Sequence, residues 1–92
     1  SFIGGEIKET FEFKTTIYNT KSTRIELEVE DQIPVSRDAR IEVTSDFSDN
    51  ATFNKETGIA TWQIQLEPNE KRVIKTKYTL KYPKELRLRY QE

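Results

Sequence analysis

The sequence predicts a single small all-β domain that folds as an antiparallel sandwich. Apolar and polar residues alternate with a period of two in five stretches of the chain, as in strands that are buried on one face. Turn-forming residues separate these stretches at short intervals, and no segment shows a helical period. The length of 92 residues fits one domain, which we take to span residues 1–92.

The five clearest strands place β-branched and aromatic residues on one face and polar or charged residues on the other. In the second of them, Ile25, Leu27 and Val29 alternate with glutamates. The fourth puts Trp62 in an apolar row that alternates with threonine and glutamine. The predicted strands span residues 7–19, 24–30, 40–44, 59–66 and 72–82.

Two further strands complete the prediction. Residues 51–53 form a short strand before the turn that ends at Gly58. Residues 86–90 form an edge strand after the break at Tyr82-Pro83. Short strands at this spacing predict an immunoglobulin-like antiparallel β-sandwich of about seven strands.

The composition excludes several kinds of active site. The chain has no histidine and no cysteine, which removes His-dependent catalytic triads and zinc sites of the usual type. The carboxylates mostly alternate with apolar residues on exposed strand faces, where the burial that a glycosidase acid needs is missing. The serines lie in predicted turns or at strand ends without a histidine partner: Ser22, Ser36, Ser45 and Ser48. We therefore expect no enzyme, no catalytic residue and no cofactor.

One loop leaves a calcium site as an open alternative. Asp46, Asp49 and Asn50, with Glu56 later in the chain, offer the oxygen ligands that Ca²⁺ prefers. The loop lacks the spacing and the glycine of an EF-hand, and loops rich in Asp and Asn are usually turns. The sequence does not decide between a turn and a calcium site.

The tryptophan of the fourth strand has two possible roles. Trp62 shares its face with Ile64 and Leu66, so we expect it to anchor the core of the sandwich. An exposed Trp62 together with an exposed Tyr78 would instead favour a carbohydrate-binding module. Four aromatic residues outside the regular apolar rows are candidates for surface contacts: Phe2, Tyr18, Phe47 and Tyr90.

Opposite charges are separated along the chain, although the net charge is only −1. One strand has an acidic outer face with Glu26, Glu28 and Glu30, while residues 71–89 are rich in lysine and arginine. Charged faces of this kind keep sheet edges from aggregating. The alternative is a docking surface on a sheet edge next to the basic last strand. The low net charge argues against nucleic acid as a partner.

Two stretches of the chain resemble a known family. The first includes residues 31–36 (Asp-Gln-Ile-Pro-Val-Ser), and the second runs from Gly58 through Trp62 to residues 82–84 (Tyr-Pro-Lys). Together they resemble the C-terminal domain of unknown function of the mucoidy inhibitor A family of bacterial proteins. More loosely, the chain resembles immunoglobulin-like repeats of bacterial surface proteins, with Asn69 in a turn where those repeats usually carry glycine. The resemblance implies a fold and no functional residues.

The expected function follows from the missing catalytic groups and from this resemblance. We expect a structural or protein–protein interaction module of a larger bacterial protein, with the present chain excised from that protein. Its partners would be other protein domains, including the rest of the parent chain, and the resemblance implies a periplasmic or cell-surface location. The alternatives are a carbohydrate-binding module with weak glycan contact and an accessory part of a hydrolase. No apolar run is long enough to cross a bilayer, so we expect no membrane insertion.

Overall fold

The computed structural model describes residues 5–86 of the chain. These residues form six β-strands and a helical turn at residues 84–86. The strands are β1 (Glu6–Tyr18), β2 (Ile25–Gln32), β3 (Glu42–Phe47), β4 (Thr52–Asn54), β5 (Ile59–Leu66) and β6 (Lys71–Pro83). In this part of the chain no helix has the length and the apolar character that a membrane span requires.

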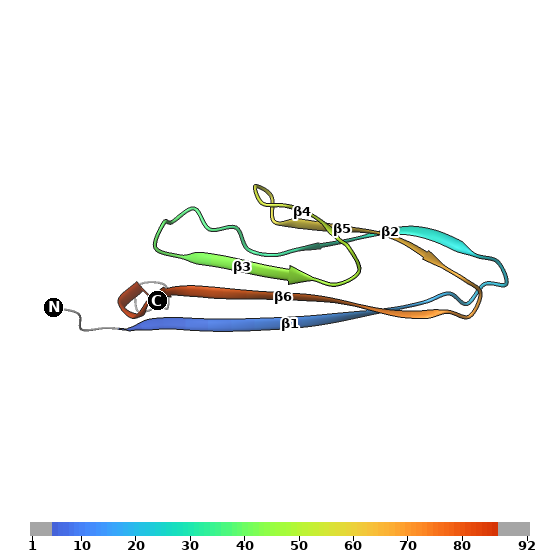
Figure 1. Ribbon diagram of the computed structural model, residues 1–92, viewed down its shortest axis with the longest axis horizontal. Helices are drawn as coiled ribbons and strands as arrows, with labels where there is room; N and C mark the ends of the chain where they lie inside the picture. Colours follow the sequence, from blue (N-terminus) through green and yellow to red (C-terminus); the bar gives the residue numbers. More distant parts are fainter. Residues whose placement is uncertain (1–4, 87–92) are drawn as a thin grey trace.

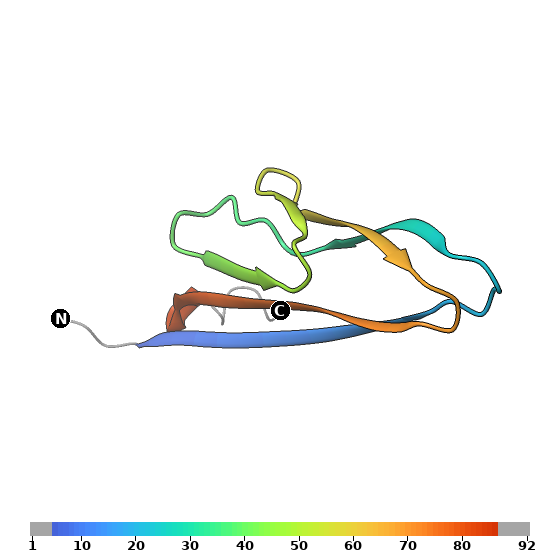
Figure 2. The same cartoon turned by 45° about the vertical axis from the view of Figure 1, so that its right-hand side comes forward.

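The strands form two antiparallel sheets that face each other (Figure 1). Sheet A has the strand order β1-β6-β3, and sheet B has the order β2-β5-β4. β1 and β6 contain 13 residues each, so sheet A extends past sheet B at the end near the N-terminus (Figures 1 and 2). At the same end, the loop between β2 and β3 carries the chain from sheet B to sheet A (Figure 2). The all-β sandwich predicted from the alternating residues is therefore confirmed.

The core lies between the sheets and is centred on β5, the middle strand of sheet B. Alternate residues of β5 are buried, while Gln63 and Gln65 on the other face are exposed. Ile74 of β6 joins the core from sheet A. A sheet that is covered on one face and wet on the other produces this alternation, so the pattern in the sequence marks the inner face directly. The buried residues of β5 are Ala60, Trp62, Ile64 and Leu66.

The strand positions agree with the sequence prediction to within two residues except in the third strand and near the C-terminus. The third strand begins and ends later than predicted, at Glu42 and Phe47. Leu86 was expected to begin a seventh strand, but it lies buried in the helical turn, and residues 87–90 lie outside the described part. Pro83 has no N–H with which to extend the pairing towards β3, and the chain turns directly after it.

A buried asparagine joins the two sheets at the end opposite the N-terminus. Asn19 directly follows β1 and is only 1% exposed. Its amide bonds to both connections at this end. Its Nδ2 donates to the carbonyl oxygens of Thr23, Leu66 and Glu67 at 2.9, 3.2 and 3.0 Å, and its Oδ1 accepts the N–H of Lys21 at 2.9 Å. One side chain thus ties the β1–β2 loop to the end of β5 and the turn that follows.

The turn between β5 and β6 contains an ion pair as well as a left-handed residue. Asn69 has a φ of 64°, which asparagine tolerates better than most residues. Glu70 accepts hydrogen bonds from Arg72 Nη2 and from the N–H of Glu67, both at 2.8 Å. The bond from Arg72, followed by the bond from Glu67, lowers the pKa of the Glu70 carboxyl below its ordinary value of 4.5.

We expect Asn19→Ala to lower the free energy of unfolding by about 3 kcal/mol, because the buried carbonyl of Leu66 and two partly buried carbonyls lose their donor. The matched control is Asn54→Ala. Asn54 Oδ1 accepts bonds from the N–H groups of Glu56 and Thr57 in an exposed turn, where water can replace it, so the loss should be about 1 kcal/mol. Urea unfolding of the three proteins measures both losses. Equal losses would show that Asn19 does not join the sheets.

The pKa of Glu70 predicts a loss of stability in acid. Because folding lowers this pKa, the ion pair stabilises the protein above about pH 4.5 and is lost as the pH falls through the lower folded-state value. We therefore expect the free energy of unfolding of the wild type to fall more steeply below pH 4.5 than that of Glu70→Gln. Urea unfolding between pH 2 and pH 7 tests this, and parallel curves for the two proteins would contradict it.

Candidate functional site

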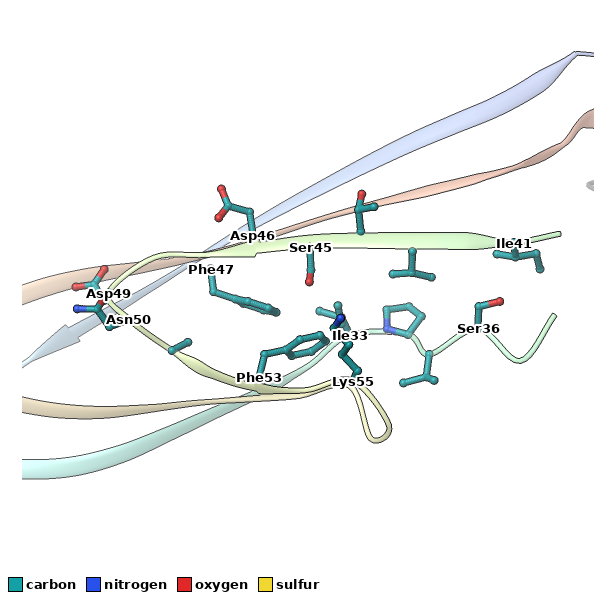
Figure 3. Close-up of a pocket in the computed structure, with 15 residues that line it drawn as sticks. Ile33, Ser36, Ile41, Ser45, Asp46, Phe47, Asp49, Asn50, Phe53 and Lys55 are labelled. Atoms are coloured by element: carbon teal, nitrogen blue, oxygen red, sulfur yellow. The ribbon is translucent and has the colours of Figure 1, made fainter. Parts of the chain in front are cut away.

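A cleft opens between the two sheets on the side of β3 and β4. Its volume is about 880 Å³, and it is bounded by β3, by the β3–β4 loop with β4, and by residues 33–36 after β2. Figure 3 shows Ser45, Phe47 and Phe53 pointing into the space between these segments. In the same view, Asn50 lies near one end of the cleft and Ser36 near the other. This cleft is larger than two other hollows of the described residues, one beside Phe13 and one beside Arg37, so we take it as the candidate site.

Three aromatic rings from three strands form the deep part of the cleft and the core behind it. The ring of Phe47 on β3 lies 4.9 Å from that of Phe53 on β4 and 5.9 Å from that of Trp62 on β5. Trp62 is only 1% exposed, and its Nε1 donates to the carbonyl oxygen of Ser48 at 2.7 Å. This hydrogen bond ties the point where the chain leaves sheet A to the centre of sheet B.

The chain crosses from sheet A to sheet B immediately after Ser48. The N–H of Ser48 donates to the carbonyl of Lys75 at 3.0 Å, and Ser48 Oγ accepts the N–H of Lys75 at 2.8 Å. Asp49 and Asn50 then adopt left-handed φ values of 57° and 56°. Asp and Asn reach this region at lower cost than most residues, so the crossing needs no glycine.

A glycine sets the position of the opposite wall. The N–H of Ile33 donates to the carbonyl of Gly58 at 2.9 Å, which holds the start of residues 33–36 against the β4–β5 turn. Gly58 has a φ of 77°, and a Cβ at this position would lie 2.3 Å from the carbonyl oxygen of Ile33. Only glycine allows this close approach, so the wall of the cleft depends on Gly58.

Among residues 5–86, no strand pairs with the backbone of β3 on the side away from β6. Ser48 and Lys75 form a hydrogen-bonded pair, and such pairs alternate along an antiparallel ladder. The backbone of Thr44 therefore bonds to Thr79 of β6. The N–H and C=O groups of its neighbours point away from β6, in the plane of the sheet. Within residues 5–86, no other hydrogen bond reaches the backbone of those neighbours. They are Val43, Ser45 and Phe47.

The other side of β6 supports this assignment. Lys84 donates to Gly5, and Asn19 donates to Glu70, so even-numbered residues of β6 bond to β1. Odd-numbered residues of β6 must then bond to β3, as the Ser48–Lys75 pair shows. Val43, Ser45 and Phe47 also line the cleft, and Figure 3 shows the side chains of Ser45 and Phe47 pointing into it. A free strand edge and an apolar cleft therefore lie together, which is the arrangement that accepts an extended peptide as an added strand.

The structure does not bring the four suggested calcium ligands together. Asp46 points away from the cleft (Figure 3), and Asp49 Oδ2 lies 4.0 Å from Arg72 Nη1. Glu56 lies in the β4–β5 turn, where the side chain of Asn54 caps its N–H. Among residues 5–86, no three Asp, Glu, His or Cys side chains are placed to hold a metal ion. The loop is a turn that connects the two sheets.

The predicted role of Trp62 in the core is confirmed by its burial. Tyr78 is half-buried and stacks on Phe11, with ring centroids 5.0 Å apart. The exposed pair that a carbohydrate-binding module would need from Trp62 and Tyr78 is therefore not formed.

Two of the four aromatic residues suggested for surface contacts lie in the described part of the chain. Tyr18 is 53% exposed, as predicted, whereas Phe47 lies in the cleft against Phe53 and Trp62. Phe13 is 51% exposed although its alternation predicts burial. It lies on the edge strand β1, opposite Thr76, and alternation alone does not reveal that a strand has a neighbour on only one side. The other two suggested residues, Phe2 and Tyr90, lie outside the described residues.

The basic last strand lies at the centre of sheet A and not at an edge. Lys75, Lys77 and Lys81 are exposed on the outer face, while Arg72 turns towards Glu70 and Asp49. The sheet edges next to this strand are therefore β1 and β3, and β3 is the one that borders the cleft.

The fold and the cleft define the chain as an all-β domain of two antiparallel sheets with an open groove at one sheet edge. The chain belongs to the family described as "Domain of unknown function (DUF4139)", which matches residues 1–84. Comparisons with curated proteins and with solved structures each gave no match.

Proline substitutions test which residues of β3 face the open edge. We expect Ser45→Pro to change the free energy of unfolding by less than about 1 kcal/mol, because its N–H makes no ladder bond and edge strands accept proline. Thr44→Pro removes a bond to β6 and should cost about 3 kcal/mol or more. Urea unfolding compares the two variants. A larger loss for Ser45→Pro would show that the opposite set of residues faces outward.

Proposed function

We propose that this domain is a non-catalytic protein–protein interaction module that binds an extended segment of a partner protein along the free edge of β3. One observation carries the proposal: Val43, Ser45 and Phe47 offer unpaired backbone groups and also line the cleft with their side chains. Backbone hydrogen bonds at a sheet edge supply affinity to such a complex. Pockets for every second side chain supply its specificity.

The dimensions of the site suit a short strand. β3 contains six residues, so a segment of similar length would lie along it for about 20 Å. An added strand lies about 4.8 Å from β3 in the plane of sheet A, and alternate side chains then point over the cleft. The cleft volume of about 880 Å³ leaves room for those side chains beside the rings of Phe47 and Phe53.

We also propose that the fold is a variant of the immunoglobulin sandwich. That fold places strands B, E and D side by side in one sheet and strands C, F and G in the other. The order β2-β5-β4 corresponds to B-E-D, and β3-β6 corresponds to C-F. β1 then occupies the place of strand G beyond F. The six strands would thus keep the strand order of the immunoglobulin fold, with β1 in the place of strand G.

The resemblance to the mucoidy inhibitor A family extends the proposal to the parent protein. We propose that the domain is a C-terminal module of a larger bacterial protein that acts in the periplasm or at the cell surface. The family match over residues 1–84 is compatible with this context. The partner segment would then belong to another protein domain or to the rest of the parent chain.

Selection from a displayed library of random 12-residue peptides tests the proposed function. We expect the 92-residue chain to select peptides in which apolar residues alternate with polar ones. In NMR titrations these peptides should shift the amide signals of Val43, Ser45 and Phe47. Ser45→Pro should weaken their binding at least tenfold, because it removes a backbone donor in the middle of the edge.

The matched control is Glu12→Pro in β1, the other edge strand of sheet A. The N–H of Glu12 also points away from β6, so this variant carries a proline at an equivalent position on the opposite edge of sheet A, and Glu12 does not line the cleft. It should bind the peptides as the wild type does. The proposal fails if no peptide is selected, if the peptides shift other amides, or if both prolines weaken binding equally.

A further inference from the structure

The outer face of β3 carries two carboxylates beside the free edge. Glu42 and Asp46 are exposed, and along β3 they alternate with Val43, Ser45 and Phe47. Figure 3 shows Asp46 pointing away from the cleft, which places it on the outer face of sheet A. A strand added to β3 would therefore have one row of side chains over the cleft and another row beside these carboxylates.

The neighbouring strand shows how sheet A pairs its charges. Lys77 of β6 lies opposite Asp46, and Lys81 lies opposite Glu42. The ammonium group of Lys81, however, contacts Glu6 of β1 at 3.6 Å. Among the described residues, no ion pair within 4 Å involves Glu42 or Asp46. Both carboxylates are thus available to a cation on the open side of β3.

The register of the edge brings an added strand close to these carboxylates. Its backbone would bond to Val43, Ser45 and Phe47, so Glu42 and Asp46 would stand in the pairs without hydrogen bonds. Side chains approach each other most closely in such pairs, and opposite charges there stabilise the sheet. Like charges in the same position destabilise it.

We propose that the partner segment alternates apolar residues with lysine or arginine, with the apolar residues over the cleft and the basic residues beside Glu42 and Asp46. This inference rests on the proposed function and specifies the chemistry of its partner. Sheet A would then present successive basic, acidic and basic rows across β6, β3 and the added strand.

Three nine-residue peptides test the charge preference. All carry valine at alternate positions, and the positions between are lysine, threonine or glutamate. We expect the lysine peptide to bind the wild-type chain about tenfold more tightly than the glutamate peptide, with the threonine peptide between them. The ratio should shrink when the ionic strength is raised, because the carboxylates are exposed. NMR titration gives the three dissociation constants and the amides that shift.

Two double variants test whether the preference for the lysine peptide comes from the carboxylates of β3 or from the net charge of the chain. Glu42→Gln with Asp46→Asn should abolish the preference for lysine. Glu26→Gln with Glu30→Gln removes the same charge from the outer face of sheet B, and it should leave the preference intact. A preference that both double variants abolish would overturn the inference.

The outcomes also separate this inference from the proposed function. Equal binding of the lysine and threonine peptides, with loss of binding in Ser45→Pro, would overturn the charge preference and leave strand addition standing. No binding of any of the three peptides would count against both. Tighter binding of the glutamate peptide would overturn the charge preference outright.

Discussion

The contact of Trp62 with the β3–β4 crossing is the interaction on which the cleft depends. Trp62 is buried at the centre of sheet B, touches the ring of Phe47 in sheet A and donates its indole N–H to Ser48. Ser48 is also the last residue of the chain that pairs with β6 before the crossing. One side chain therefore fixes both the spacing of the sheets and the point where β3 ends. Without that anchor, the position of the edge of β3 relative to the rings of Phe53 and Trp62 would not be fixed.

Two further constraints act at opposite ends of this anchor, one between the two sheets and one within sheet B. At one end, the amide of Asn19 ties the β1–β2 loop to the end of β5, and a polar group so well satisfied can be buried without penalty. At the other end, the backbone of Ile33 lies against Gly58 at a distance that a larger residue would not permit. Between these ends the cleft is open because β3 and β4 are both edge strands and neither covers the other. The cleft is thus a consequence of the strand order, which leaves β3 and β4 at the edges of their sheets.

An open strand edge is usually a hazard, because it can pair with other chains without selection. Here the edge of β3 is short, its outer face carries Glu42 and Asp46, and its inner face borders a cleft. These features limit indiscriminate pairing and give an extended segment of suitable pattern a specific place to bind. The longer edge of β1 carries charges of both signs on its outer face, such as Lys8 and Glu12, which suits an edge that stays in solvent.

The sequence by itself determined the class of fold, the strands and the core, because the inner face of a one-sided sheet repeats every second residue. The burial of Trp62 was predictable for the same reason. The absence of histidine and cysteine excluded His-dependent triads and the usual zinc sites. The order of the strands was decided only by tertiary structure, because alternation says which face of a strand is buried and nothing about its neighbours. The central position of β6, the exposure of Phe13 and the role of Phe47 in the cleft all depend on that order. The candidate site therefore could not be read from the sequence: Val43, Ser45 and Phe47 form it only because β3 lies at the edge of its sheet.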